Sequence, residues 1–129
     1  MIKIISISIL TVSVLFSSLV FAGGHTKGMY IHIINFNITG IDRSQYEGGA
    51  MQATSAFAAV PGLIRKHWLA NEENNTYGGV YIFNSKESHD AFTESELYAG
   101  VKGNPSFTNF SGKSFENIDS LAKHTRGTE

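Results

Sequence analysis

Four segments of the chain show the alternation or short apolar runs that are typical of β-strands. They span residues 29–38, 63–70, 77–83 and 107–115, and the first is rich in β-branched and aromatic side chains between two glycines. The polar run 71–76 (NEENNT) joins the second segment to the third and predicts a hairpin loop.

A first helix is predicted between the first two strands. Asp42 is a good N-cap, and Gln45 three residues later completes a capping-box pattern. Apolar side chains then recur at helical spacing until Pro61 and Gly62 end the helix. These side chains are Tyr46, Ala50, Ala53, Phe57 and Val60.

A second helix is predicted between the third and fourth strands. Asn84 is its expected cap, with Glu87 completing another capping-box pattern, and a mildly apolar stripe runs on to Val101 before the break at 103–105. The resulting order β-α-β-β-α-β predicts an α+β protein of the ferredoxin-like, split βαβ class.

Both faces of the predicted sheet carry apolar side chains. In the first strand Tyr30, His32, Ile34 and Phe36 share one face, while residues 29, 31 and 33 share the other. Two helices cover one face of a sheet, so the second face needs a partner subunit, a ligand or both. A two-fold homodimer is the commonest solution, and we therefore expect one.

The N-terminus has the pattern of a secretory signal peptide. Lys3 precedes an apolar run, and residues 20–22 (Val-Phe-Ala) end the segment with short side chains where a signal peptidase cuts. The alternative is a membrane anchor, but several serines interrupt a stretch that is short for a span. We expect cleavage after Ala22, a flexible leader over 23–28, a domain over 29–121 and a polar tail over 122–129. The protein is then periplasmic or secreted.

Composition excludes several classes of chemistry and partner. The chain has no cysteine, so thiolate nucleophiles and Cys-metal sites are impossible. A net charge of −1 argues against nucleic acid or an anionic membrane as a partner. The five histidines show no metal-ligand spacing, and we expect neither metal nor another cofactor.

The sequence resembles the YdhR-like family of monooxygenases over roughly residues 29–121. The resemblance implies a dimeric α/β barrel, in which two ferredoxin-like protomers pack sheet against sheet. It also implies a relationship to cofactor-independent monooxygenases that oxidise polycyclic phenols to quinones with O2. The most specific part is the Trp68 strand joined to the Tyr-Gly-Gly-Val-Tyr strand, and the segments that carry the resemblance are 61–63, 66–69, 76–83, 95–97, Val101 and Phe115.

Three residues are candidates for catalysis under this resemblance. Trp68 can stack a flat substrate, His32 can remove a phenolic proton near neutral pH, and Tyr81 can steady the developing oxyanion. Each has a structural alternative, because large aromatic residues fill cores and interfaces and a buried histidine can simply be hydrogen-bonded. His67 is a second candidate base, but it alternates with Trp68, so one of the two faces away from the cavity. The sequence leaves open which one.

Further residues are expected to contact a small aromatic ligand. They are Phe36, Tyr30, Phe83 and His67. Some dimeric α/β barrels degrade haem with an asparagine, a tryptophan and a histidine. This chain has such residues in Asn35, Trp68 and His89, but the position of the haem ligand holds Val101-Lys102. The competing hypotheses are a non-catalytic exported protein that binds an apolar or aromatic ligand, and a structural dimer without a cavity.

Overall fold

The computed structural model describes residues 28–128, so the predicted signal peptide and nearly all of the leader lie outside the described residues. The strands are β1 (Tyr30–Ile38), β2 (Leu63–Asn71), β3 (Thr76–Phe83) and β4 (Phe107–Glu116). The helices are α1 (Arg43–Ala58), α2 (Lys86–Thr93), α3 (Glu96–Lys102) and α4 (Asp119–Ala122), followed by the 3-10 turn η1 (Lys123–Thr125).

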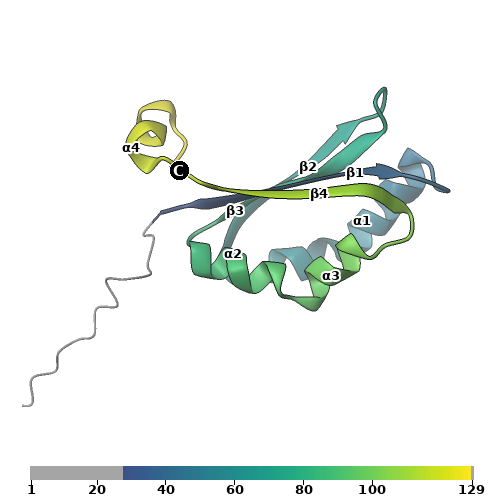
Figure 1. The fold of residues 1–129 in the computed structure, drawn as a ribbon, viewed down its shortest axis with the longest axis horizontal. Coiled ribbons are helices and arrows are strands. Elements are labelled where there is room, and N and C mark those ends of the chain that lie inside the picture. The colour runs from purple at the N-terminus through teal and green to yellow at the C-terminus, as the bar shows by residue number, and fades with distance from the viewer. Residues whose placement is uncertain (1–27, 129) are drawn as a thin grey trace, which may run out of the picture.

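The strands form one antiparallel sheet in the order β2-β3-β1-β4, which confirms the predicted ferredoxin-like βαββαβ arrangement. Helices α1, α2 and α3 all lie against one face of this sheet (Figure 1). The short α4 lies beyond the end of the sheet, apart from the other helices. In residues 28–128 no helix has the length and apolar character needed to cross a membrane.

Local hydrogen bonds set the helix ends. The Asp42 side chain accepts from the Gln45 backbone at 2.8 Å while the Gln45 side chain accepts from the Asp42 backbone, which confirms the predicted capping box. The prediction of one continuous second helix capped by Asn84 was wrong. Ser85 caps α2, and Ser95 accepts from the Tyr98 backbone and starts α3 anew.

One extra residue in β2 decides which of its side chains face the helices. Leu63 pairs with Phe83, but Arg65 pairs with Ile82 and Lys66 with Tyr81, so a bulge lies between Leu63 and Arg65. A bulge shifts the pattern of alternation along a strand. Beyond it, Lys66 and Trp68 share the face of Tyr81.

Two adjacent glycines let β3 fit closely between its neighbours. Gly78 has a φ of +154°, and a Cβ there would lie 1.8 Å from the Ile34 carbonyl oxygen. At Gly79 a Cβ would lie 3.1 Å from both Lys66 Cε and Tyr81 Cε2. The backbones of β3 and β1 therefore approach closely at Gly78, and the bare backbone of Gly79 leaves room for the Lys66 side chain.

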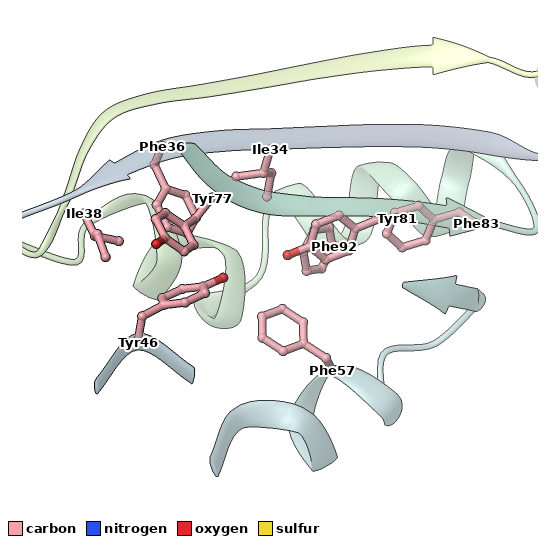
Figure 2. Packing of buried hydrophobic residues seen from close by; sticks show 9 residues of the cluster. All are labelled: Ile34, Phe36, Ile38, Tyr46, Phe57, Tyr77, Tyr81, Phe83 and Phe92. Atoms are coloured by element: carbon pink, nitrogen blue, oxygen red, sulfur yellow. The ribbon is translucent and has the colours of Figure 1, made fainter. Parts of the chain in front are cut away.

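The core lies between the sheet and the helices. Figure 2 shows side chains of β1 and β3 pointing toward Tyr46 and Phe57 of α1, with Phe92 of α2 beside them. Aromatic rings dominate this layer, and several meet edge to face, such as Phe36 with Tyr46.

The opposite face of the sheet carries apolar side chains that no helix covers. Ile31 pairs with both Ile82 and Phe115, and Ile33 pairs with Val80. Because β1 buries its alternate residues against the helices, these side chains point the other way. The outer face of the sheet, as we call this set, is half-buried or exposed within the single chain.

Candidate functional site

A pocket of about 390 Å³ opens between the sheet, α1 and α3. Its volume lies in the range of small-molecule sites. Most of the wall is apolar or aromatic, with Phe36 from β1, Tyr46 and Phe57 from α1, and Phe107 from β4. Trp68 and Lys66 of β2, Tyr81 of β3 and Leu97 of α3 complete its central part. Such a wall suits a flat apolar ligand.

Lys66 is the one lysine or arginine on the described wall of this pocket, and aromatic rings surround its amine. The Nζ atom lies 3.2 Å from the centroid of the Trp68 ring and 3.3 Å from that of Phe57. The Tyr81 ring is 4.6 Å away. Within residues 28–128 Lys66 has neither an ion pair nor a hydrogen bond.

Burial lowers the pKa of the Lys66 amine to about 7, because desolvation disfavours the ammonium. The ring faces attract a cation, but they replace hydration and a counter-ion only in part. Near neutral pH the amine therefore holds its proton weakly. It can serve both as a cation and as a base.

Two tyrosine hydroxyls face the same space. Figure 2 shows the hydroxyls of Tyr46 and Tyr81 pointing toward one another between α1 and the sheet. Neither donates a hydrogen bond to another residue within 28–128, although both residues line the pocket. Burial raises the pKa of Tyr46 to about 12 and that of Tyr81 further, so both stay protonated donors. They are available to an oxygen atom of a ligand.

The structure brings three of the sequence candidates into this pocket. Trp68, Tyr81 and Phe36 all line it. Trp68 lines the pocket and is 42% exposed. His67 pairs with Val80 on the outer face of the sheet and is exposed, so Trp68 is the member of this pair that faces the pocket.

His32 lies elsewhere, in a hydrogen-bonded chain of three residues that joins two buried histidines to the half-exposed Asp90. Its Nδ1 is 3.0 Å from His89 Nε2, and His89 Nδ1 is 2.8 Å from Asp90 Oδ1. A carboxylate accepts from His89, so in the neutral pair His89 Nε2 accepts from His32 Nδ1–H. The remaining atom, His32 Nε2, is buried and has no hydrogen-bond partner among residues 28–128.

The environment of His32 disfavours its protonated form. Burial, and then the charge of nearby His89, lower the pKa of His32 to about 4. The side chain is 4% exposed and does not line the pocket. It is packed instead against the rings of Tyr98, Phe92 and Tyr81.

The other sequence candidates also lie away from the pocket wall. Phe83 is fully buried in the core, stacked on Tyr81, and Tyr30 packs against His89 near the start of α2. The haem-type set does not surround one site either. Asn35 alternates with buried Ile34 and so faces the outer side of the sheet, and both ring nitrogens of His89 are already hydrogen-bonded. Within 28–128 no three His, Asp or Glu side chains cluster as a metal site would require.

Sequence reasoning missed Lys66, Tyr46 and Phe57 as site residues. Tyr46 and Phe57 were predicted only as the apolar stripe of α1. Lys66 had a signal of its own, because it lies two residues before Trp68 and must share its face in a regular strand. A lysine at an inward-facing position is rare unless it is paired, and this one has no partner in the described chain.

Solved structures of low sequence identity share this fold. A protein of unknown function from Nitrosomonas europaea, NE2512, aligns with a TM-score of 0.61 and 12% identity, covering 71% of this chain and 91% of that one. SnoaB, a cofactor-independent oxygenase from Streptomyces nogalater, aligns with a TM-score of 0.59 and 14% identity, covering 73% and 97%. A point mutant of MhuD, with two manganese protoporphyrin IX molecules bound per active site, aligns with a TM-score of 0.56 and 20% identity, covering 69% and 94%.

These neighbours share the ferredoxin-like α+β fold of this chain, and one of them, SnoaB, is a cofactor-independent oxygenase. Residues 31–128 match the sequence profile of the family described as "Putative mono-oxygenase ydhR". The chain therefore belongs to the ydhR family. No curated protein sequence matches it.

The buried histidine makes stability depend on pH. His32 binds a proton less tightly in the folded state than in the unfolded chain, so unfolding takes up a proton between pH 6.5 and about 4. The free energy of unfolding is thus complete above pH 6.5 and falls as the pH drops toward 4, by about 3 kcal/mol at most. Urea unfolding of the purified protein across this range measures the loss.

Glutamine keeps a hydrogen-bonding amide at this position but does not titrate, so His32→Gln is expected to remove most of this pH dependence. The matched control is His67→Gln, which alters an exposed histidine and should leave the slope unchanged. An equal slope in wild type and His32→Gln would contradict the assignment.

Proposed function

We propose that this protein is a monooxygenase that oxidises a small aromatic or polycyclic phenol with O2, without metal or flavin. The observation that carries the proposal is the pocket itself. It joins a flat aromatic wall to a few ionisable or hydroxyl groups that have no partner within the described chain. Membership of the ydhR family supports the reaction class.

The chemistry needs an electron-rich anion and a dry, shaped cavity. Removing the phenolic proton leaves the electron pair on oxygen, and the anion then passes one electron to O2 to give an aryloxyl radical and superoxide. Their recombination at a ring carbon that carries hydrogen forms a hydroperoxide, which loses water to give the quinone. One phenol and one O2 thus give one quinone and one water.

Three of the wall residues suit this reaction. Trp68 and Phe36 offer ring faces that can hold the substrate ring, and proximity of this kind lowers the barrier to a bimolecular step. The protonated Tyr81 hydroxyl is a donor for the oxygen that develops negative charge. The competing function, a protein that binds the same ligand without turnover, uses the same pocket.

The proposal includes a homodimer. Ile31, Ile33, Val80, Ile82 and Phe115 form an apolar outer face that the helices leave open. A second copy that packs its own sheet on this face would bury both, as in the dimeric α/β barrels to which this fold belongs. We also propose that the mature protein is exported, which rests on the sequence pattern of residues 1–22, and the intact mass of the exported protein tests it.

Trp68→Ala is expected to lower kcat/KM for oxygen uptake by about 10- to 100-fold, because the loss of the ring removes substrate positioning. The measurement is oxygen consumption by metal- and flavin-free protein against a panel of anthrones and hydroquinones. Trp68→Phe keeps an aromatic face and should retain most of the activity.

Two outcomes would contradict the proposal. One is oxygen uptake that Trp68→Ala leaves unchanged, which would place the reaction outside this pocket. The other is a lack of uptake combined with saturable quenching of fluorescence by the same compounds. Since Trp68 is the single tryptophan of the chain, such quenching reports on ligand bound beside this residue and would identify a binding protein instead.

Ile33→Lys is expected to turn the dimer into a monomer, because it puts a charge at the centre of the outer face next to Lys113. Light scattering coupled to size-exclusion chromatography measures the mass. Met51→Lys is the control with the same charge change, since Met51 is 71% exposed on α1. A dimer that survives Ile33→Lys would argue against this interface.

A further inference from the structure

The position of Lys66 disfavours the folded state, because its amine is partly removed from water. Such a position suggests that the amine has a function in the pocket. A lysine normally keeps its ammonium in water and buries only its stem. Here the Nζ atom lies over the faces of Phe57 and Trp68 at 3.3 and 3.2 Å, and no carboxylate of residues 28–128 pairs with it. Desolvation is therefore not offset by an ion pair.

The backbone around Lys66 holds the amine at the pocket wall. The bulge before Arg65 turns Lys66 toward the helices, and Gly79 leaves space where the lysine stem crosses β3. The Tyr81 ring closes the third side at 4.6 Å. The amine thus lies beside the space that a flat ligand would occupy.

We propose that Lys66 is the general base of the oxygenation proposed above, and that it accepts the proton of the ligand's phenolic hydroxyl. This inference rests on the proposed function. It assigns to the pocket a ligand whose reactive oxygen carries an acidic hydrogen.

The step is a single proton transfer. The O–H bond of the phenol breaks, its electron pair stays on oxygen, and a new N–H bond forms on Lys66. The resulting ammonium then lies next to the phenolate and forms with it the ion pair that Lys66 lacks within residues 28–128. The hydroxyls of Tyr46 and Tyr81 are free to donate to the same oxygen. The phenolic oxygen thus gains negative charge at a place where hydrogen-bond donors already point.

Other groups near the pocket suit the task less well. His32 Nε2 is buried in the core, and His32 does not line the pocket. Glu96 of α3 lines the pocket but is exposed. Lys66 has a pKa of about 7, so most of its amine is free to accept a proton slightly above neutrality.

The test uses 2-naphthol, a two-ring phenol that is neutral in water at about pH 8 and whose anion absorbs at longer wavelength. Bound to the wild-type protein under argon, it should show the spectrum of the anion. In a weakly buffered solution with an indicator dye, binding should release no proton to the solvent, because Lys66 retains it. Excluding O2 separates this step from turnover.

Two substitutions separate a base from a mere counter-ion. Lys66→Met keeps the length of the stem without the amine, and the bound naphthol should remain neutral. Lys66→Arg keeps the charge but cannot accept a proton at this pH, so any anion that forms there releases one proton per ligand. With O2 and an oxidisable phenol, both variants should lose about 100-fold or more in kcat.

Three results would overturn the role of Lys66. They are a neutral bound naphthol in the wild type, an anion that persists in Lys66→Met, and an anion in the wild type whose proton appears in solution. Circular dichroism confirms that each variant folds, and Lys102→Met, an exposed lysine of α3 outside the pocket wall, is the matched control. If bound naphthol ionises as expected but no phenol consumes O2, the oxygenase proposal fails while the proton transfer stands.

Discussion

The single extra residue in β2 is the constraint on which the pocket depends. Without the bulge between Leu63 and Arg65, Arg65 would pair with Tyr81, and Lys66 and Trp68 would point to the outer face of the sheet. The pocket would then lose its cation and its largest ring. The bulge also directs His67 to the outer face. One local irregularity therefore decides which side chains of β2 line the pocket and which face away from it.

The chemistry of the site follows from polar groups that are removed from water without gaining a hydrogen-bond or ion-pair partner. Folding places an amine among rings and two phenolic hydroxyls beside a cavity, and it gives them no partners in the described chain. Unpaired polar groups reduce stability, so their persistence in a small domain is a mark of function. The chain of Asp90, His89 and His32 differs, because within residues 28–128 every ring nitrogen of its two buried histidines except His32 Nε2 has a hydrogen-bond partner. The burial of the two histidines favours a structural contribution that depends on pH.

Much of the fold was predictable because its signals are local. Alternation located all four strands, and Asp42 with Gln45 located the start of α1. The break between α2 and α3 was missed, since Ser95 lies within a weak apolar stripe and acts as a cap only through its hydrogen bond to the Tyr98 backbone. For the site, the sequence indicated Trp68, Tyr81 and Phe36. It could not distinguish Trp68 from His67, because a bulge is a property of strand pairing, and it overlooked Lys66 because the rings around it come from three separate elements.

We expect the Lys66 amine to lose its proton near neutral pH inside the aromatic pocket. The most direct measurement is an NMR titration of the lysine side chains in protein labelled with 13C-lysine, assigned with the Lys66→Met variant. We expect one ε-methylene signal that is shifted by the neighbouring rings and titrates with a midpoint of about 7. A signal for Lys66 that titrates near the ordinary lysine value of about 10.4 would contradict this expectation.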